Sequence, residues 1–168
     1  APSFASPFAL TTLMDQDGRR FSFAALKGKT VVMNFIFTHC PVSCPAQTRA
    51  LTLIQQALPK PLSPHVLFVS VTMDPQRDTP ATLKRYAGTI GADLASWSFV
   101  TGSEAEIGWL NQFYDVRVTR AAPGQFDHRV VVYLLDATGR LAQKYAGDFD
   151  KPRLLREIGE VARIFNKT

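Results

Sequence analysis

The sequence predicts a single α/β domain in which a central mixed sheet is flanked by helices. The chain has 168 residues, of which 46% are hydrophobic, and this suits one domain with a sizeable core. Apolar runs typical of buried strands alternate with segments of helical periodicity. No repeat, low-complexity tract or Ser/Gly-rich linker divides the chain, so we expect one domain over residues 1–168.

The predicted strands are short runs rich in apolar residues. They are expected at residues 30–37, 65–73, 97–100, 129–136 and 141–147. The first two are nearly continuous apolar runs with β-branched residues, as in strands that are buried on both faces. A turn at residues 137–140 makes the last two strands antiparallel neighbours.

The predicted helices follow from apolar spacing and from capping signals. They are expected at residues 46–58, 80–90, 103–114 and 151–165. The first ends at Pro59. Thr79 is the expected N-cap of the second, with Pro80 at its first position. Ser103 and Glu106 have the spacing of a capping box at the start of the third.

An additional hairpin precedes these elements. Asp17-Gly18 is a turn signal between two half-buried strands in residues 8–23. The strands and helices that follow alternate and then end in a hairpin and a last helix, which implies right-handed crossovers and helices on both faces of the sheet. The order fits a thioredoxin-like fold with an N-terminal β-hairpin extension.

The charge and hydropathy of the chain exclude some classes of function. Lys and Arg exceed Asp and Glu by five, but no dense basic run or aromatic-basic interleaving points to nucleic acid. No apolar stretch reaches the roughly 20 residues that a membrane helix needs, and residues 1–10 lack the pattern of a signal peptide. Because the apolar content is large, we expect the domain to fold without a metal.

The only two cysteines, Cys40 and Cys44, lie between a predicted strand and a predicted helix. Ligands bind at the carboxyl end of strands in open α/β sheets, and a helix N-terminus favours thiolates. A spacing of four residues places both side chains on one face of a helical segment. The pair can therefore form a disulfide or hold one soft metal ion.

One of the three histidines is the candidate for a third ligand. His65 begins a strand and is expected to be an exposed loop residue, and His39 is expected to have a structural or supporting role. His128 precedes the strand at residues 129–136, and in this fold the loop before that strand lies beside the cysteine segment. Two thiolates and one imidazole suit Cu(I), or Cu(II) with an added oxygen ligand.

Several alternatives compete with a copper site. Structural zinc needs a fourth protein ligand, and the Cys-x-x-Cys-His pattern of haem attachment is absent. A thiol-disulfide oxidoreductase or redox sensor that uses Cys40 and Cys44 is the second hypothesis, and a peroxiredoxin-like peroxidase is the third. Thioredoxin-type exchangers have a cis-proline before the strand where this chain has Asp127-His128-Arg129, which favours a metal site.

Three motifs in order resemble the Sco (SCO/SenC) family of copper chaperones. They are Cys40-Pro41-Val42-Ser43-Cys44-Pro45, the segment VSVTMDPQRDTP, and FDHRVVVYLLDATGRL around His128. The resemblance runs from about residue 8 to the last helix. It implies that Cys40, Cys44 and His128 hold one copper ion per chain.

The resemblance also implies a function. It implies delivery of copper to the copper-site subunit of cytochrome c oxidase, or reduction of the cysteines of that dinuclear site, with a copper donor or a thiol-disulfide reductant as a second partner. Both chemistries belong outside the cytosol, so a periplasmic or equivalent compartment is expected, with a membrane tether that this chain lacks. Many members have Asp where this chain has Val42, which removes a carboxylate beside the metal loop.

Two acidic segments are expected to have structural or supporting roles. The residues from Asp74 to Pro80 are adequate as a strand exit and a helix cap, and we prefer that interpretation, although Arg77 and Asp78 could contact a partner or the metal loop. Asp127 is placed to orient His128, because metal-bound imidazoles usually donate their other N–H to an acceptor.

Overall fold

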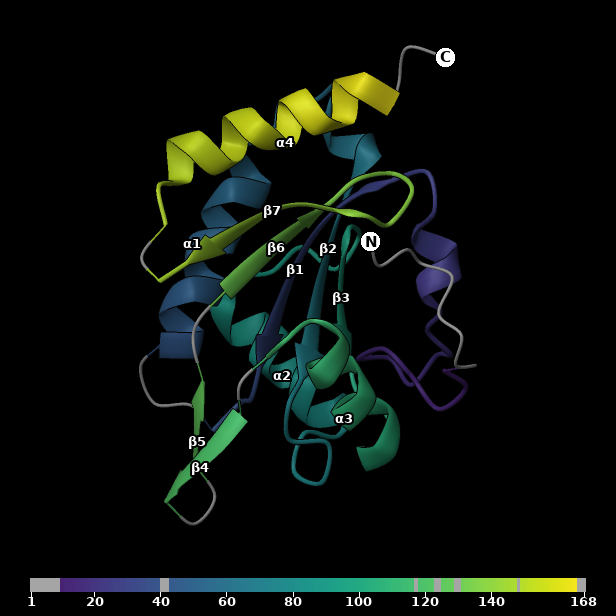
Figure 1. The fold of residues 1–168 in the computed structure, drawn as a ribbon, viewed down its shortest axis with the longest axis vertical. Coiled ribbons are helices and arrows are strands. Elements are labelled where there is room, and N and C mark those ends of the chain that lie inside the picture. The colour runs from purple at the N-terminus through teal and green to yellow at the C-terminus, as the bar shows by residue number, and fades with distance from the viewer. Residues whose placement is uncertain are drawn as a thin grey trace.

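A five-stranded mixed sheet forms the centre of the computed structural model, in the strand order β3-β2-β1-β6-β7 (Figure 1). The structure describes residues 10–39, 43–116, 118–122, 125–128, 131–147 and 149–165. The strands of this sheet are β1 (Thr30–Ile36), β2 (Val66–Thr72), β3 (Trp97–Val100), β6 (Val131–Leu135) and β7 (Leu141–Ala146). A separate antiparallel pair is formed by β4 (Val118–Ala122) and β5 (Gln125–His128).

In the described residues, four α-helices and two short 3-10 helices surround the strands. The α-helices are α1 (Ser43–Ala57), α2 (Pro80–Ile90), α3 (Glu104–Phe113) and α4 (Lys151–Phe165). The 3-10 helices are η1 (Phe23–Leu26) and η2 (Ser63–His65). In the described ranges, none of the helices is long and apolar enough to cross a bilayer.

The strand directions bring distant parts of the chain to one edge of the sheet. β1 is parallel to β2, and β2 is parallel to β3, whereas β6 is antiparallel to β1 and to β7. Asn34, near the end of β1, pairs with Val132, near the start of β6. The segments that leave β1 and β2 and the segment that enters β6 therefore share one edge.

The core has two parts, one on each face of the sheet. On β1, Val31, Met33 and Phe35 belong to the cluster that contains η1 and α3 residues. Val32 and Ile36 belong to the other cluster, with residues of α1, α2 and α4. All seven residues of β1 are buried, as expected for a central strand with helices on both sides.

The predicted elements agree with the structure in type and order, and the fold class is confirmed. Thr79 and Ser103 are the N-caps of α2 and α3, as expected. The N-terminal hairpin is less regular than predicted, because Met14 forms only isolated bridges, one to Arg20 and one to Thr101. The Glu106 backbone N–H bonds to the Ser103 hydroxyl, but the Glu106 carboxylate bonds to residues of the N-terminal segment and does not complete the capping box.

The β4–β5 pair was not predicted, and it projects beyond the main sheet (Figure 1).

A pair of tyrosines, Tyr114 and Tyr133, holds the segment that leads into β4. The Tyr133 hydroxyl on β6 donates a 2.9 Å hydrogen bond to the backbone oxygen of Tyr114, the C-cap of α3. Burial, with a contribution from Asp115, raises the pKa of Tyr133 to about 12, so the hydroxyl remains a donor at neutral pH.

Candidate metal and thiol site

The structure places Cys44 in the first turn of α1, at the sheet edge defined above. Cys40 lies outside the described residues. No acidic residue occupies the first turn of α1, so no nearby carboxylate on the helix offsets the positive potential of its N-terminus. A helix N-terminus with this potential in general favours the thiolate form of a cysteine placed there.

His128 approaches the same edge from a distant part of the chain. It is the last residue of β5, where it pairs with Val118, and it precedes the start of β6 by three residues. In the view of Figure 1, β5 is drawn below the ends of β1 and β6. Asp127 precedes His128 and pairs with Thr119. The backbone topology thus brings Cys44 and His128 to one side of the molecule.

The ligand set itself remains a prediction. In the part of the chain that the structure describes, no group of three His, Cys, Asp or Glu side chains is arranged to hold a metal ion. The expected set includes Cys40, which lies beyond that part.

The structure defines the hydrogen bonds that hold this edge of the sheet together. Asp78 is fully buried and accepts three hydrogen bonds. Its carboxylate accepts from the Thr38 N–H at 3.1 Å, from the Thr38 hydroxyl at 2.6 Å and from the Thr72 hydroxyl at 2.7 Å. Thr38 precedes Cys40 by two residues. One carboxylate therefore ties the exit of β1 to the exit of β2 and to the start of α2.

This result modifies the preferred interpretation of the segment from Asp74 to Pro80. Asp78 does more than precede a helix cap, because it binds the stem of the cysteine segment. Asp74 serves the local turn: its carboxylate pairs with Arg77, its N–H donates to Thr72 Oγ1 at 2.9 Å, and its backbone oxygen accepts from the Asp78 N–H at 2.9 Å. The aspartate–proline segment is thus a brace for the candidate site.

His39 extends this network to the surface. Its Nδ1 lies 3.2 Å from Thr38 Oγ1 and 4.0 Å from Asp78 Oδ1, and half of its side chain is exposed. Because the Thr38 hydroxyl gives its single hydrogen to Asp78, we assign the proton to His39 Nδ1, which then donates to Thr38. This assignment agrees with the supporting role expected for His39.

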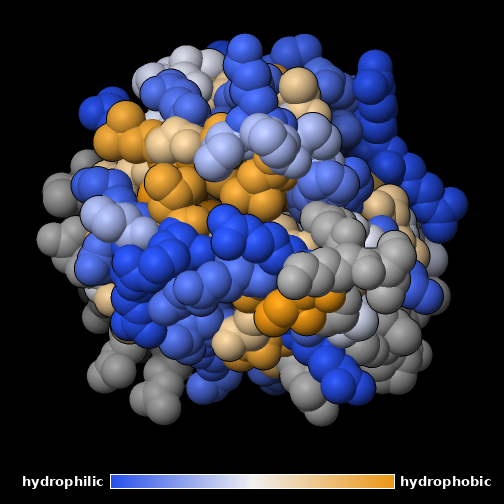
Figure 2. Space-filling model, turned by 90° about the horizontal axis from the view of Figure 1, so that it is seen from above, coloured by the Kyte–Doolittle hydropathy of each residue, from blue (hydrophilic) through white to orange (hydrophobic). Residues whose placement is uncertain are grey.

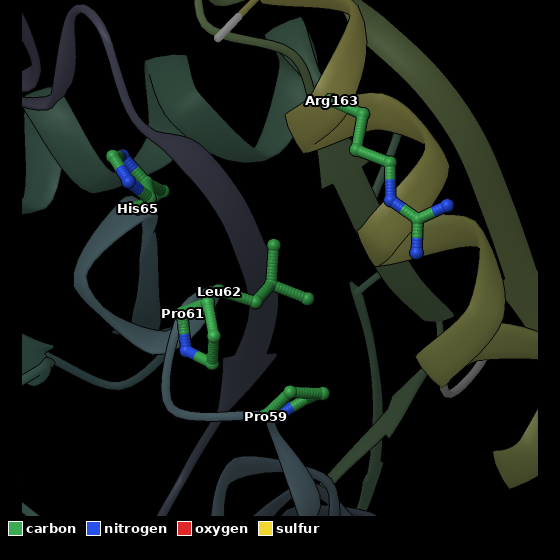
Figure 3. Close-up of a pocket in the computed structure, with 5 residues that line it drawn as sticks. All are labelled: Pro59, Pro61, Leu62, His65 and Arg163. Carbon is green, nitrogen blue, oxygen red and sulfur yellow. The ribbon is translucent and has the colours of Figure 1, made fainter.

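His65 lies at the opposite end of the sheet. It ends η2, is partly buried and lines a cavity of about 400 Å³, so the expectation of an exposed loop residue was wrong. Pro59, Pro61 and Leu62 supply the apolar wall of this cavity, and Arg163 projects from α4 on its other side (Figure 3). Figure 2 looks down on the α4 end of the molecule, where apolar patches alternate with hydrophilic ones.

Sequence reasoning missed one buried polar residue near the site. Asn34 lies inside an apolar strand and has no exposed surface. Its amide donates to Gln47 Oε1 at 3.1 Å and to Thr48 Oγ1 at 3.3 Å, both one turn after Cys44 on α1. A polar residue in an otherwise apolar strand was the available signal, since buried amides require partners.

The mixed sheet, with a cysteine-bearing helix directly after its central strand, defines a thioredoxin-like domain. The family model described as SCO1/SenC matches residues 1–163, and the chain belongs to this family.

Two curated relatives illustrate the match. The chain is 32% identical over 144 residues to the SCO1 protein homolog of Bacillus subtilis, and the match covers 84% of this chain and 74% of that protein. It is 30% identical over 141 residues to the mitochondrial SCO2 homolog of Bos taurus, covering 80% of this chain and 52% of that protein. The chain thus spans about half the length of the bovine relative.

Solved structures of the family have the same fold. A SCO1/SenC family lipoprotein from Bacillus anthracis superposes with a TM-score of 0.82 at 30% identity, over 90% of this chain and 92% of that one. BsSco, described by its disulfide switch and as a member of a family of cytochrome c oxidase assembly proteins, gives 0.80 at 27% identity over 96% and 94%. Yeast Sco1 with copper bound gives 0.79 at 28% identity over 96% and 90%.

Proposed function

We propose that this domain binds one copper ion through Cys40, Cys44 and His128 and passes it on as a metallochaperone. The observation that supports the proposal is one of topology: Cys44 lies in the first turn of α1, which follows β1, and His128 ends β5, shortly before β6, which pairs with β1. Two thiolates and an imidazole form a soft, low-coordinate set that suits copper. The copper-bound structure of yeast Sco1 supports the same cargo.

The partner we propose is the copper-site subunit of cytochrome c oxidase. The description of BsSco as a member of a family of oxidase assembly proteins supports this partner. Handover then needs a ligand exchange in which the acceptor's ligands replace those of this domain. An edge site at a helix terminus is suited to such exchange, because the metal is not enclosed by the core.

The compartment we propose is the periplasm or an equivalent extracytoplasmic space. Copper traffic to the oxidase and stable disulfides both belong there. The lipoprotein among the structural relatives supports attachment of such domains to a membrane.

A second candidate function is thiol-disulfide exchange by Cys40 and Cys44. The structure of BsSco is described by its disulfide switch, and this supports thiol-disulfide exchange as the second candidate. The two functions differ in the role of His128. In the copper site His128 supplies the only nitrogen ligand, whereas in an exchanger it would tune the reactivity of the thiolates.

His128→Ala separates the two functions when Cu(II) titration and thiol-exchange kinetics are measured on the same protein. For a chaperone, the variant binds Cu(II) weakly and loses the visible thiolate-to-copper band, because Cu(II) needs nitrogen or oxygen ligands in addition to sulfur. Its exchange with small thiols stays close to that of the wild type. His65→Ala is the matched control, because His65 lies at the other end of the sheet. An intact Cu(II) band with altered exchange would favour the oxidoreductase.

A further inference from the structure

A row of hydrogen-bonded, buried polar groups crosses the face of the sheet beneath α1. Asn34 and Ser70 are paired residues of β1 and β2, and both are fully buried. The Trp97 Nε1–H of β3 donates to Ser70 Oγ at 3.0 Å, and the Ser70 hydroxyl donates to Asn34 Oδ1 at 2.6 Å. The row therefore runs from β3 across the sheet to α1.

The donor-to-acceptor direction of these hydrogen bonds fixes the orientation of the Gln47 side-chain amide. Since Asn34 Oδ1 accepts from Ser70, only the Asn34 amide nitrogen remains to face α1, and it can only donate. The Gln47 group facing it at 3.1 Å must be the oxygen Oε1. Gln47 Nε2 is then turned away from Asn34.

Among the residues that the structure describes, none gives Gln47 Nε2 a hydrogen-bond partner, although only 7% of Gln47 is exposed. A buried donor without an acceptor is costly, and native proteins rarely keep one without a reason. Gln55, on the same helix, shows the usual arrangement: its Nε2 donates to Asp93 O and to Ser96 Oγ, both at 2.9 Å. The amide of Gln47 is thus oriented and has spare donor capacity.

The position of Gln47 on α1 indicates which acceptor it serves. It follows Cys44 by three residues, and residues three apart lie on the same face of a helix. Cys44 thus lies one turn before Gln47 at a position on the same face of α1. A thiolate there is an acceptor without a hydrogen of its own.

We propose that Gln47 is a positioning residue that donates a hydrogen bond from Nε2 to the Cys44 sulfur in its thiolate and copper-bound states. The inference rests on the proposed function in taking Cys44 as a ligand. The bond stabilises the reduced dithiol state relative to the disulfide, because a disulfide sulfur is a much weaker acceptor than a thiolate. It also lowers the energy of the sulfur electrons that take part in charge transfer to Cu(II).

The test compares Gln47→Met with Gln47→Leu and with the control Gln55→Met. Methionine keeps the length of the side chain and removes the donor, and Asn34 keeps its bond to Thr48. The reduced and disulfide forms of Cys40 and Cys44 are equilibrated with reduced and oxidised glutathione. Two electrons and two protons pass to the protein disulfide as two glutathione molecules form one glutathione disulfide.

Both Gln47 variants should become harder to reduce. We expect the equilibrium constant for reduction to fall about tenfold, which corresponds to about 30 mV for a two-electron couple. Gln55→Met should leave it unchanged, although that variant loses paired hydrogen bonds. In the copper-loaded protein, the thiolate-to-copper band of the Gln47 variants should move to lower energy.

The outcomes distinguish this inference from the proposed function. A glutathione equilibrium and a charge-transfer band that stay at the wild-type values in both Gln47 variants would overturn the inference, even with copper fully bound. The same result with lower stability alone would show that Gln47 is only structural. A shifted glutathione equilibrium in a protein that binds no copper would support the bond from Gln47 to the Cys44 thiolate and overturn the copper function.

Discussion

Removal of the Asp78 carboxylate should destabilise the fold more than removal of any comparable surface acceptor. In Asp78→Ala, the Thr38 N–H and the Thr72 hydroxyl lose their acceptor in a buried site. Each buried donor without a partner costs about 1–3 kcal/mol. Thr38 as a whole is only partly buried, so its hydroxyl can rotate toward water. The expected loss in the free energy of unfolding is therefore about 4 kcal/mol, or roughly 10 °C in melting temperature for a chain of this size.

Asp136→Ala is a matched control for this prediction. Asp136 Oδ1 also accepts three hydrogen bonds, from the Thr138 N–H, the Thr138 hydroxyl and the Arg140 N–H, at 2.8, 2.6 and 3.1 Å. These bonds are exposed in the turn between β6 and β7, where water can replace the carboxylate. We expect a loss of about 1 kcal/mol or less.

Urea denaturation of the reduced, metal-free proteins measures both changes. Asp78→Asn keeps one acceptor oxygen and should fall between wild type and Asp78→Ala, at about 1–2 kcal/mol. An equal loss in Asp78→Ala and Asp136→Ala would refute the reasoning, because the two sites differ in burial and not in the number of accepted bonds. A loss below about 1 kcal/mol in Asp78→Ala would refute it as well.

Two further predictions concern the other buried and part-buried networks. Asn34→Ala leaves the Ser70 hydroxyl without its acceptor and should cost about 3 kcal/mol in urea denaturation, whereas a change below about 0.5 kcal/mol would contradict the network. For Glu106, burial raises the pKa, but hydrogen bonds from Thr12 and Thr11 outweigh it and lower the pKa below the ordinary 4.5. Its contribution to stability is therefore present above pH 4.5 and is lost as the pH falls through the lowered pKa. Glu106→Gln should be less stable than wild type at pH 6, and the difference should shrink below pH 4, which pH-dependent melts can check; a pH-independent difference would contradict it.

Most regular elements could be predicted from local signals. Hydrophobic runs located the five strands of the sheet, and Thr79, Pro80 and Ser103 marked helix starts at the residues where the structure has them. These features depend on residues close in sequence. The β4–β5 pair was missed because its strands lack both a continuous apolar run and a clear apolar alternation.

The remaining differences between the predicted and the observed structure come from contacts between residues that are far apart in sequence. Thr38 and Asp78 are 40 residues apart, and nothing local in the aspartate–proline segment identifies the partner of the carboxylate. Likewise, the Glu106 carboxylate had an expected local role at Ser103, but the N-terminal segment offers it two backbone N–H donors and a hydroxyl. Local capping rules cannot include such partners, because they depend on how the finished fold brings the chain together.

The candidate site was predicted from residue types and spacing. The strand topology accounts for the approach of its two parts, the cysteine segment and the segment that carries His128. The antiparallel pairing of β1 with β6 brings the entry to β6 beside the exit of β1, as the sequence interpretation required for His128 and the cysteines. The sequence interpretation allowed Asp78 to contact the metal loop, but its burial and its bonds to Thr38 and Thr72, like the bond between Gln47 and Asn34, depend on the finished fold.

Copper titration of the fully reduced chain tests the central claim most directly. We predict one copper ion per chain, with a thiolate-to-copper band for Cu(II), and no tight binding to the form in which Cys40 and Cys44 are joined as a disulfide. The Cys40→Ser/Cys44→Ser double variant should also bind no copper tightly, while circular dichroism shows that it remains folded. Stoichiometric copper binding by the disulfide form or by the folded double variant would contradict the assignment and place the copper site elsewhere.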